Sequence, residues 1–187
     1  MARPKQHTPE NILSAALSLF RDEGVNVSTA RIAQEAEVSN GTLFNNFPTK
    51  QALIDALYLS IKNDLAQAIG TLPAEGSIRT RMRLVWDRWF TWARRNRDAY
   101  VVMNLLLQSN LASPEAQQAG SDALKGRSVL TEAMDSGALV DLPLEYLAGL
   151  IQHQLDQAVM SDLNDDQAQV AFGVLWNGIT QPMEETP

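Results

Sequence analysis

The apolar residues near the start of the chain recur every three or four positions, which is the period of an α-helix. Thr8-Pro9-Glu10 has the form of an N-cap followed by proline at the first helical position. An apolar stripe then runs from Ile12 to Phe20, and Gly24 stops it. The pattern therefore predicts a first amphipathic helix.

Three further helix starts follow at short intervals. Ser28 and Ser39 are good N-caps, and each precedes a short helical pattern. Thr49 precedes a longer apolar stripe that continues to Ile69. Four helices are therefore expected in this part of the chain, the fourth over 49–69.

The remainder of the chain keeps the helical period in longer elements. No alternating strand pattern persists, so the predicted fold class is all-α. The expected helices cover 77–96, 97–111, 113–137, 143–163 and 165–180.

Charge is distributed unevenly along the chain. The net charge is −7 and the sequence pI about 4.8, which taken alone disfavours nucleic acid as a partner. From Met1 to Lys50, however, five basic residues balance five acidic ones. After Arg97, two basic residues oppose thirteen acidic ones. Any contact with DNA must therefore come from the first part and be local.

The composition excludes several kinds of catalytic and metal-binding site. The chain has no cysteine, which excludes disulfides, thiol nucleophiles and cysteine-based zinc sites. Its two histidines lack metal-ligand spacing, and no glycine-rich phosphate loop or Ser-His-acid arrangement occurs. No apolar run approaches the roughly 20 residues that cross a bilayer, and no signal peptide begins the chain. We expect no catalytic residues, metal or cofactor, no membrane partner, and a cytoplasmic location.

The stretch VSNGTLFNNFPTK, residues 38–50, follows the second short helix after a tight connection. Two short helices joined in this way are typical of a helix-turn-helix, whose second helix enters the major groove of DNA. Leu43 and Phe47 are four apart and should point inward. The polar side would then be formed by Asn40, Gly41, Thr42 and Asn45, with Asn46 as a further candidate. By spacing alone, an ordinary helical hairpin facing water fits equally well.

The residue types on this polar side suit DNA. Asn and Thr can hydrogen-bond base edges and phosphates, and a threonine methyl can contact a thymine methyl. Gly41 would let the backbone approach DNA without a Cβ in the way. Lys50 would combine its charge with the free N–H groups at the start of the fourth helix, which is a favourable arrangement for phosphate.

The segments ILSAALSLFRDEG and TARIAQEAEVSNGTLFNNFPTKQALIDAL resemble the TetR family of transcriptional regulators. An IA pair, a VS-x-GTLY-x-x-F core and a following lysine occur in the family's order and spacing. Two positions depart from the pattern: Phe44 replaces the usual tyrosine, and Glu37 the usual turn glycine. The resemblance implies that the DNA-facing residues are Ser28, Thr29, Arg31, Ser39, Asn40, Gly41, Thr42, Phe44, Asn45 and Lys50.

Aromatic residues concentrate in VWDRWFTWARR, residues 85–95, which holds three of the four tryptophans. A packed core and the wall of a pocket for a flat ligand both explain this. Within the TetR family, ALYLSIKNDL and RLVWDRWFTWA are similar to RamR-like multidrug-responsive repressors. That resemblance implies that Tyr58 and Trp86 face a ligand. The predicted ligand-binding residues are Tyr58, Trp86, Trp89, Ile151, Leu155 and Asp156.

Asp156 would favour a cationic ligand, although a single aspartate on a helix is more often only solvated.

The last two expected helices are apolar on more than one side, and therefore need burial on two sides. A two-fold contact between subunits would provide it. The predicted interface residues are Leu150, His153, Ala171, Leu175 and Gly178.

The sequence thus predicts a dimeric DNA-binding transcriptional regulator, with a repressor released by a small aromatic or cationic effector as the favoured mode. Its expected partners are a double-stranded DNA operator, that effector and a second copy of the chain. The predicted domains are a helix-turn-helix domain over 1–52 and a ligand-binding and dimerisation domain over 53–187. Two alternatives remain open: a helical ligand carrier or enzyme, and a helical interaction module that does not bind DNA.

Overall fold

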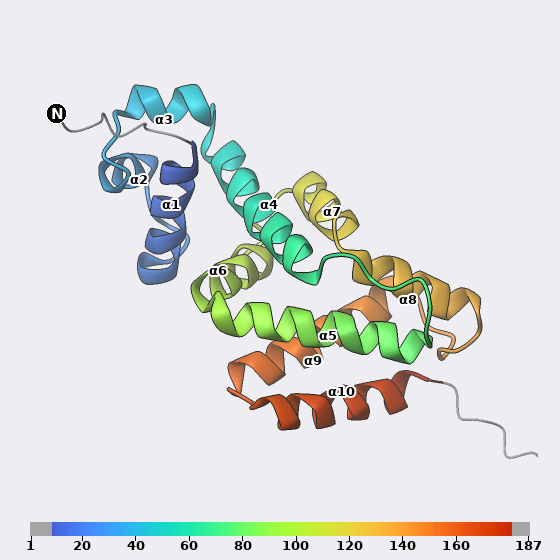
Figure 1. Cartoon of the computed structure of the whole chain (residues 1–187). Coiled ribbons are helices and arrows are strands. Elements are labelled where there is room, and N and C mark those ends of the chain that lie inside the picture. Colours follow the sequence, from blue (N-terminus) through green and yellow to red (C-terminus); the bar gives the residue numbers. More distant parts are fainter. Residues whose placement is uncertain (1–8, 181–187) are drawn as a thin grey trace, which may run out of the picture. The chain divides into compact units, whose positions relative to one another are not determined.

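The structure, a computed structural model, describes residues 9–180, with only the backbone of Lys125 (Figure 1). This part of the chain forms helices and no β-strand; one isolated bridge joins Leu139 and Thr180. The predicted all-α class is confirmed. The helices are α1 Pro9–Glu23, α2 Thr29–Glu35, α3 Asn40–Asn46, α4 Lys50–Ile69, α5 Ile78–Arg95, α6 Arg97–Gln108, α7 Pro114–Asp122, α8 Lys125–Asp135, α9 Leu144–Met160 and α10 Asp165–Ile179.

Two of the predicted helix limits are not matched by a described helix limit. The expected N-cap Thr8 lies outside the described residues. The single helix expected over 113–137 is wrong, because α7 and α8 are separated at Leu124, whose backbone is extended (φ −85°, ψ 117°). Just beyond this break, Gly126 packs so closely on α5 that an added Cβ would lie 2.8 Å from a methyl of Val85. Packing on α5 thus accompanies a helix break that local sequence did not reveal.

The chain forms two compact units, each built from two stretches of sequence. The first comprises Met1–Asp64 and Asn96–Ser121, and the second Leu65–Arg95 and Asp122–Pro187. The helices α6 and α7 therefore pack with α1 to α3 and most of α4. The limits of these packing units differ from the domain boundary predicted after residue 52. That boundary separates functions rather than packing units, and it stays a prediction.

The first unit is held together by apolar burial and by polar links between distant segments. In its core, α1 packs against α2 and α6, and α2 against α3. The Arg21 guanidinium on α1 lies 3.0 Å from the Asp98 carboxylate on α6. On α4, Asp55 accepts a hydrogen bond from the backbone N–H of Ser113 (2.9 Å), and Gln51 donates to the Leu111 carbonyl (2.8 Å). These bonds connect α4 to the segment that precedes α7.

Close packing between α4 and α7 covers Tyr58. The side chain of Tyr58 is 1% exposed, and a Cβ at Gly120 would lie 2.9 Å from its ring and 3.0 Å from Cγ of Lys62. Burial raises the pKa of the Tyr58 phenol to about 12. Only a residue without a side chain fits at Gly120.

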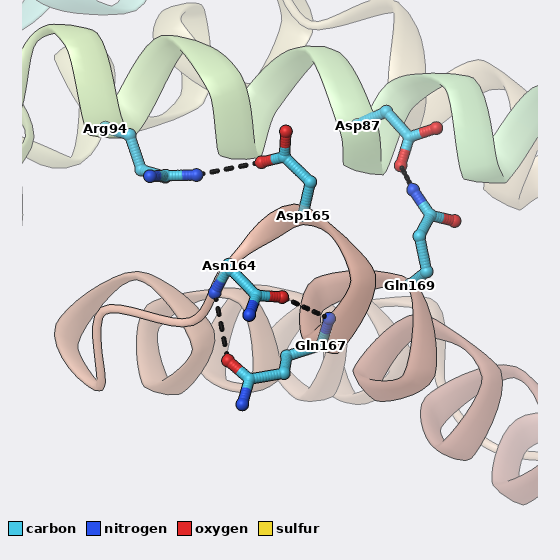
Figure 2. Close-up of polar contacts among 6 residues, drawn as sticks. All are labelled: Asp87, Arg94, Asn164, Asp165, Gln167 and Gln169. Carbon is cyan, nitrogen blue, oxygen red and sulfur yellow. Dashed lines mark hydrogen bonds and ion pairs between the residues drawn. The ribbon is translucent and has the colours of Figure 1, made fainter.

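The second unit is arranged around α5, which contacts α8, α9 and α10. Its aromatic side is buried, and the Trp86 indole N–H donates to the Ala168 carbonyl of α10 (3.1 Å). Figure 2 shows two further links from α5 to α10, in which Arg94 pairs with Asp165 (2.8 Å) and Gln169 donates to Asp87 (2.7 Å). These contacts fix α10 in register along α5.

The start of α10 is also closed locally. The Asn164 side chain accepts from the backbone N–H of Gln167, and the Gln167 side chain accepts from that of Asn164, a reciprocal capping box (Figure 2).

Within residues 9–180, no helix is both long enough and apolar enough to span a bilayer.

The contact at Gly120 leads to a stability prediction. Gly120→Ala should lower the free energy of unfolding by about 1 to 3 kcal/mol, because the new methyl must displace the Tyr58 ring or the Lys62 stem. Urea unfolding measures this. Gly41→Ala is the matched control, since its Cβ would meet only the Ser39 hydroxyl at an ordinary 3.7 Å. If the two variants are equally stable, the close α4–α7 packing is wrong.

Candidate functional site

The turn between α2 and α3 is built from side-chain caps and one strained residue. Ser28 caps α2 by accepting from the backbone N–H of Arg31 (3.2 Å), which confirms the predicted helix start. After α2, the Val38 N–H donates to the Ala33 carbonyl (2.9 Å), and Glu37 adopts φ 56°. This left-handed backbone is the conformation that glycine favours. Glu37 thus keeps the expected turn geometry without glycine.

The helix α3 is anchored from behind by two apolar residues. Its N-cap Ser39 accepts from the backbone N–H of Thr42 (3.0 Å), again as predicted. Leu43 is fully buried and Phe47 is 7% exposed. Their spacing of four places both on one side, so the opposite side of α3 must face outward.

The outward face of α3 is formed by Asn40, Gly41, Phe44 and Asn45, all exposed. The aromatic side chain of Phe44 is 42% exposed. The predicted polar face therefore does not lie inside the monomer. It presents amide groups, a bare backbone position and an aromatic ring on one short helix.

The side chains of Thr42 and Asn46 form hydrogen bonds within the protein and are only partly exposed. The hydroxyls of Thr42 and Ser39 share a hydrogen bond of 2.9 Å, and the Asn46 amide donates to the Thr42 carbonyl (2.8 Å). Both residues are half-buried. Asn45 is thus the exposed amide of the Asn45–Asn46 pair, and of the two only Asn45 belongs to the predicted DNA-facing set.

The start of α4 lies directly after α3. Thr49 caps it by accepting from the backbone N–H of Ala52 (3.0 Å). Lys50 is half-buried, and its ammonium group lies 3.4 Å from the Val25 carbonyl in the loop between α1 and α2. A phosphate at this helix start would meet free N–H groups and one cation that can turn outward.

Arg31 is the other cation of this region, and it is already paired. Its guanidinium lies 2.9 Å from the Glu35 carboxylate and 3.3 Å from that of Glu23. Neither partner was predicted from the sequence. The spacing of four on α2 could have indicated Glu35. Glu23, at the end of α1, becomes a neighbour only through folding.

Comparison with known proteins identifies this arrangement. Residues 12–57 match the family model described as bacterial regulatory proteins, tetR family. A putative tetR family transcription regulator from Shewanella sp. PV-4 is 28% identical, with a TM-score of 0.73 over 93% of this chain and 98% of that chain. The chain is a DNA-binding transcriptional regulator, and its residues 12–57 match the TetR family.

Two other matches extend over most of the regulator. The fatty acid metabolism regulator protein of Bacillus subtilis (strain 168) is 26% identical, and the match covers 91% of this chain and 94% of the relative. A TetR family transcription regulator from Marinobacter aquaeolei VT8 shares the fold, with a TM-score of 0.80 at 18% identity, over 97% of this chain and all of that one. The family and the fold are those of regulators rather than enzymes.

The predicted effector residues fall in both units of the regulator. Tyr58 is buried in the first unit. In the second unit Trp86, Trp89 and Leu155 are buried, while Ile151 and Asp156 are half-buried. Asp156 accepts a hydrogen bond from Gln152 (2.9 Å), so its carboxylate has a neighbour on its own helix. The role of these residues in ligand binding stays a prediction.

An aromatic cluster lies between α5 and α10 in the second unit. The ring centroids of Trp86 and Phe172 are 5.9 Å apart and tilted by 53°, and those of Phe172 and Trp176 are 6.0 Å apart. Phe172 and Trp176 were not among the predicted ligand residues. Their helical spacing of four was visible, but only the packing of α10 on α5 brings them to Trp86.

The predicted interface residues lie on accessible sides of α9 and α10. His153 and Gly178 are exposed, and Leu150, Ala171 and Leu175 are half-buried. The same two helices carry four exposed large apolar residues, Tyr146 (55%), Met160 (54%), Val170 (68%) and Val174 (65%). These helices therefore leave apolar surface uncovered in the monomer.

The outward face of α3 leads to a prediction with a built-in control. Asn45→Ala should weaken binding to a selected operator by about 5- to 150-fold if the amide reads a base, and should change binding to unrelated DNA far less. Asn46→Ala removes the same group from the neighbouring position, where it bonds the helix backbone, and should have little effect. Fluorescence anisotropy with labelled duplexes measures both. Equal losses for the two variants would contradict the assignment.

Proposed function

We propose that this regulator is a repressor that binds its operator as a homodimer and leaves it when a small effector binds the second unit. The observation that carries the proposal is the outward face of α3, held in place by Leu43 and Phe47. It supplies hydrogen-bonding groups for base edges on an exposed α-helix, and the major groove is wide enough to admit an α-helix.

The residues around α3 supply contacts to the DNA backbone. Ser28, Thr29 and Ser39 lie at helix starts, where backbone N–H groups favour phosphate. Phe44 has no phenolic hydroxyl, so its exposed ring would contribute apolar contact with sugars in place of a hydrogen bond. Lys50 would turn from the Val25 carbonyl to a phosphate.

The homodimer is supported by the uncovered apolar surface of α9 and α10. A second copy, related by a two-fold axis, would bury the exposed side chains Tyr146, Val170 and Val174 together with the predicted interface residues. A dimer bound to a two-fold operator requires its two copies of α3 to reach half-sites about 34 Å apart on DNA.

The effector proposal rests on the aromatic side of α5 in the second unit. Trp86 and Trp89 offer ring faces, and Asp156 lies on α9, which contacts α5. An aromatic cation fits this composition and the similarity to RamR-like multidrug-responsive repressors. The name of the Bacillus subtilis relative suggests a second candidate, a fatty acid, which would lie against the same apolar side chains.

The effector needs only to bind a DNA-incompetent arrangement of the regulator better than the competent one. A coupling free energy of about 1 to 3 kcal/mol changes operator occupancy by about 5- to 150-fold. Tyr58 stays a predicted effector contact. Because α7 covers its ring at Gly120, a ligand would reach it only after α7 moves away from α4.

The proposal is tested by selecting an operator from a random duplex library with the full-length protein, and by binding to DNA that flanks its own gene. Sequence-selective, salt-sensitive binding is expected. Recovery of no preferred sequence would favour an interaction module that does not bind DNA. Turnover of a substrate without DNA binding would favour the helical carrier or enzyme.

The dimer contact leads to a further prediction. Val170→Asp with Val174→Asp should give a monomer by sedimentation and lower operator affinity, because charge replaces the buried apolar contact. The fold should persist, since both residues are more than half exposed in the monomer. Leu142→Asp, at another exposed apolar residue, is the control and should remain dimeric. A dimeric double variant would contradict the interface.

The effector site leads to a conservative test at Trp86. Trp86→Phe keeps a ring in the core but removes the indole, so it should shift the concentration of effector that releases DNA. Operator affinity without effector is measured alongside, because the indole also bonds the Ala168 carbonyl of α10. Trp92→Phe, a buried tryptophan of the same helix outside the predicted set, is the control. The probes are tetraphenylphosphonium and palmitate. If an effective probe releases both variants and the unaltered protein at the same concentration, Trp86 does not contact it.

A further inference from the structure

The DNA-facing region of this regulator contains few basic residues. Between Gly24 and Ile61 the chain has two, Arg31 and Lys50. Residues 9–64 carry seven acidic and four basic side chains, so this part has an excess of negative charge. Since phosphate contacts supply most of the sequence-independent affinity for DNA, each available cation has a large effect.

In the free protein, Arg31 makes two ion pairs. One terminal nitrogen of its guanidinium lies 2.9 Å from the Glu35 carboxylate, one helical turn further along α2. The other lies 3.3 Å from the carboxylate of Glu23, at the end of α1. The two pairs thus occupy both terminal nitrogens, which are the groups that would hold a phosphate in a bidentate contact.

The two pairs are accessible to solvent. The side chains of Arg31, Glu23 and Glu35 are 38%, 46% and 44% exposed. Ion pairs at such positions are weak, each corresponding to about a two- to fivefold effect on an equilibrium. They are therefore strong enough to orient Arg31 in the free protein and weak enough for a DNA phosphate to displace.

We propose that Glu23 and Glu35 are positioning residues that hold Arg31 along α2, and thereby limit the affinity of the regulator for DNA of any sequence. This inference rests on the proposed operator binding. A phosphate that recruits Arg31 must first displace two carboxylates, and both then remain close to the DNA. Because phosphates carry no sequence information, the cost falls on operator and unrelated DNA alike. Base contacts from α3 must then supply a larger share of the net affinity, while the ratio of operator affinity to affinity for unrelated DNA stays the same.

The test uses full-length Glu23→Gln and Glu35→Gln, singly and together, with a selected operator duplex and a scrambled duplex of equal length. Each substitution should raise affinity by about two- to fivefold for both duplexes, because it releases Arg31 without changing the side-chain shape. Fluorescence anisotropy at several salt concentrations measures the gain. Unchanged or lower affinity, or a gain confined to the operator, overturns the inference.

Two controls separate this effect from a general loss of negative charge. Asp22→Asn removes the same charge beside Glu23, but Asp22 pairs with Arg21 (3.1 Å), so its gain should be less than half as large. The glutamine substitutions are also made in the Arg31→Ala background, where their gain should fall to the Asp22→Asn level. A full gain without Arg31 overturns the positioning role.

The outcomes also distinguish this inference from the proposed function. If the unaltered protein binds its operator and the glutamine variants bind equally well, only the inference fails. If the unaltered protein and all variants bind neither duplex, operator binding itself is wrong and the inference fails with it. Thermal unfolding of each single variant checks that the protein folds without the corresponding ion pair.

Discussion

The burial of Leu43 and Phe47 is the constraint on which the functional surface depends. These two side chains fix the rotation of α3 about its own axis, so the opposite side, with Asn40, Gly41, Phe44 and Asn45, faces outward. The caps at Ser39 and Thr49 then fix where α3 and α4 begin. A helix of only seven residues has little stability of its own, and its position therefore comes from this packing.

Affinity for DNA in an acidic protein must come from few groups. The strongly negative part of the chain lies beyond Arg97, and the helix-turn-helix region offers helix starts and hydrogen-bonding side chains in place of a basic patch. In the free protein, Arg31 faces two carboxylates and Lys50 lies near a backbone carbonyl. A low density of available charge restricts sequence-independent binding, which in turn increases the relative contribution of base contacts.

The second unit combines a stiff framework with surface that the monomer leaves uncovered. The indole of Trp86 bonds the backbone of α10, and polar links at Asp87 and Arg94 repeat the connection along the two helices. A change at the aromatic side of α5 would therefore be transmitted to α10. Since α10 also carries exposed Val170 and Val174, effector binding and subunit contact would involve the same helix.

The sequence by itself determined the all-α class, the capped starts at Ser28 and Ser39, and the buried side of α3, because these follow from local hydrogen bonding and helical periodicity. Tertiary structure alone decided that α6 and α7 belong to the first unit, that the helix expected over 113–137 is interrupted at Leu124, and that Glu23 reaches Arg31. Each of these depends on contacts between residues distant in sequence. Periodicity shows which side of a helix is buried, but not which helix covers it.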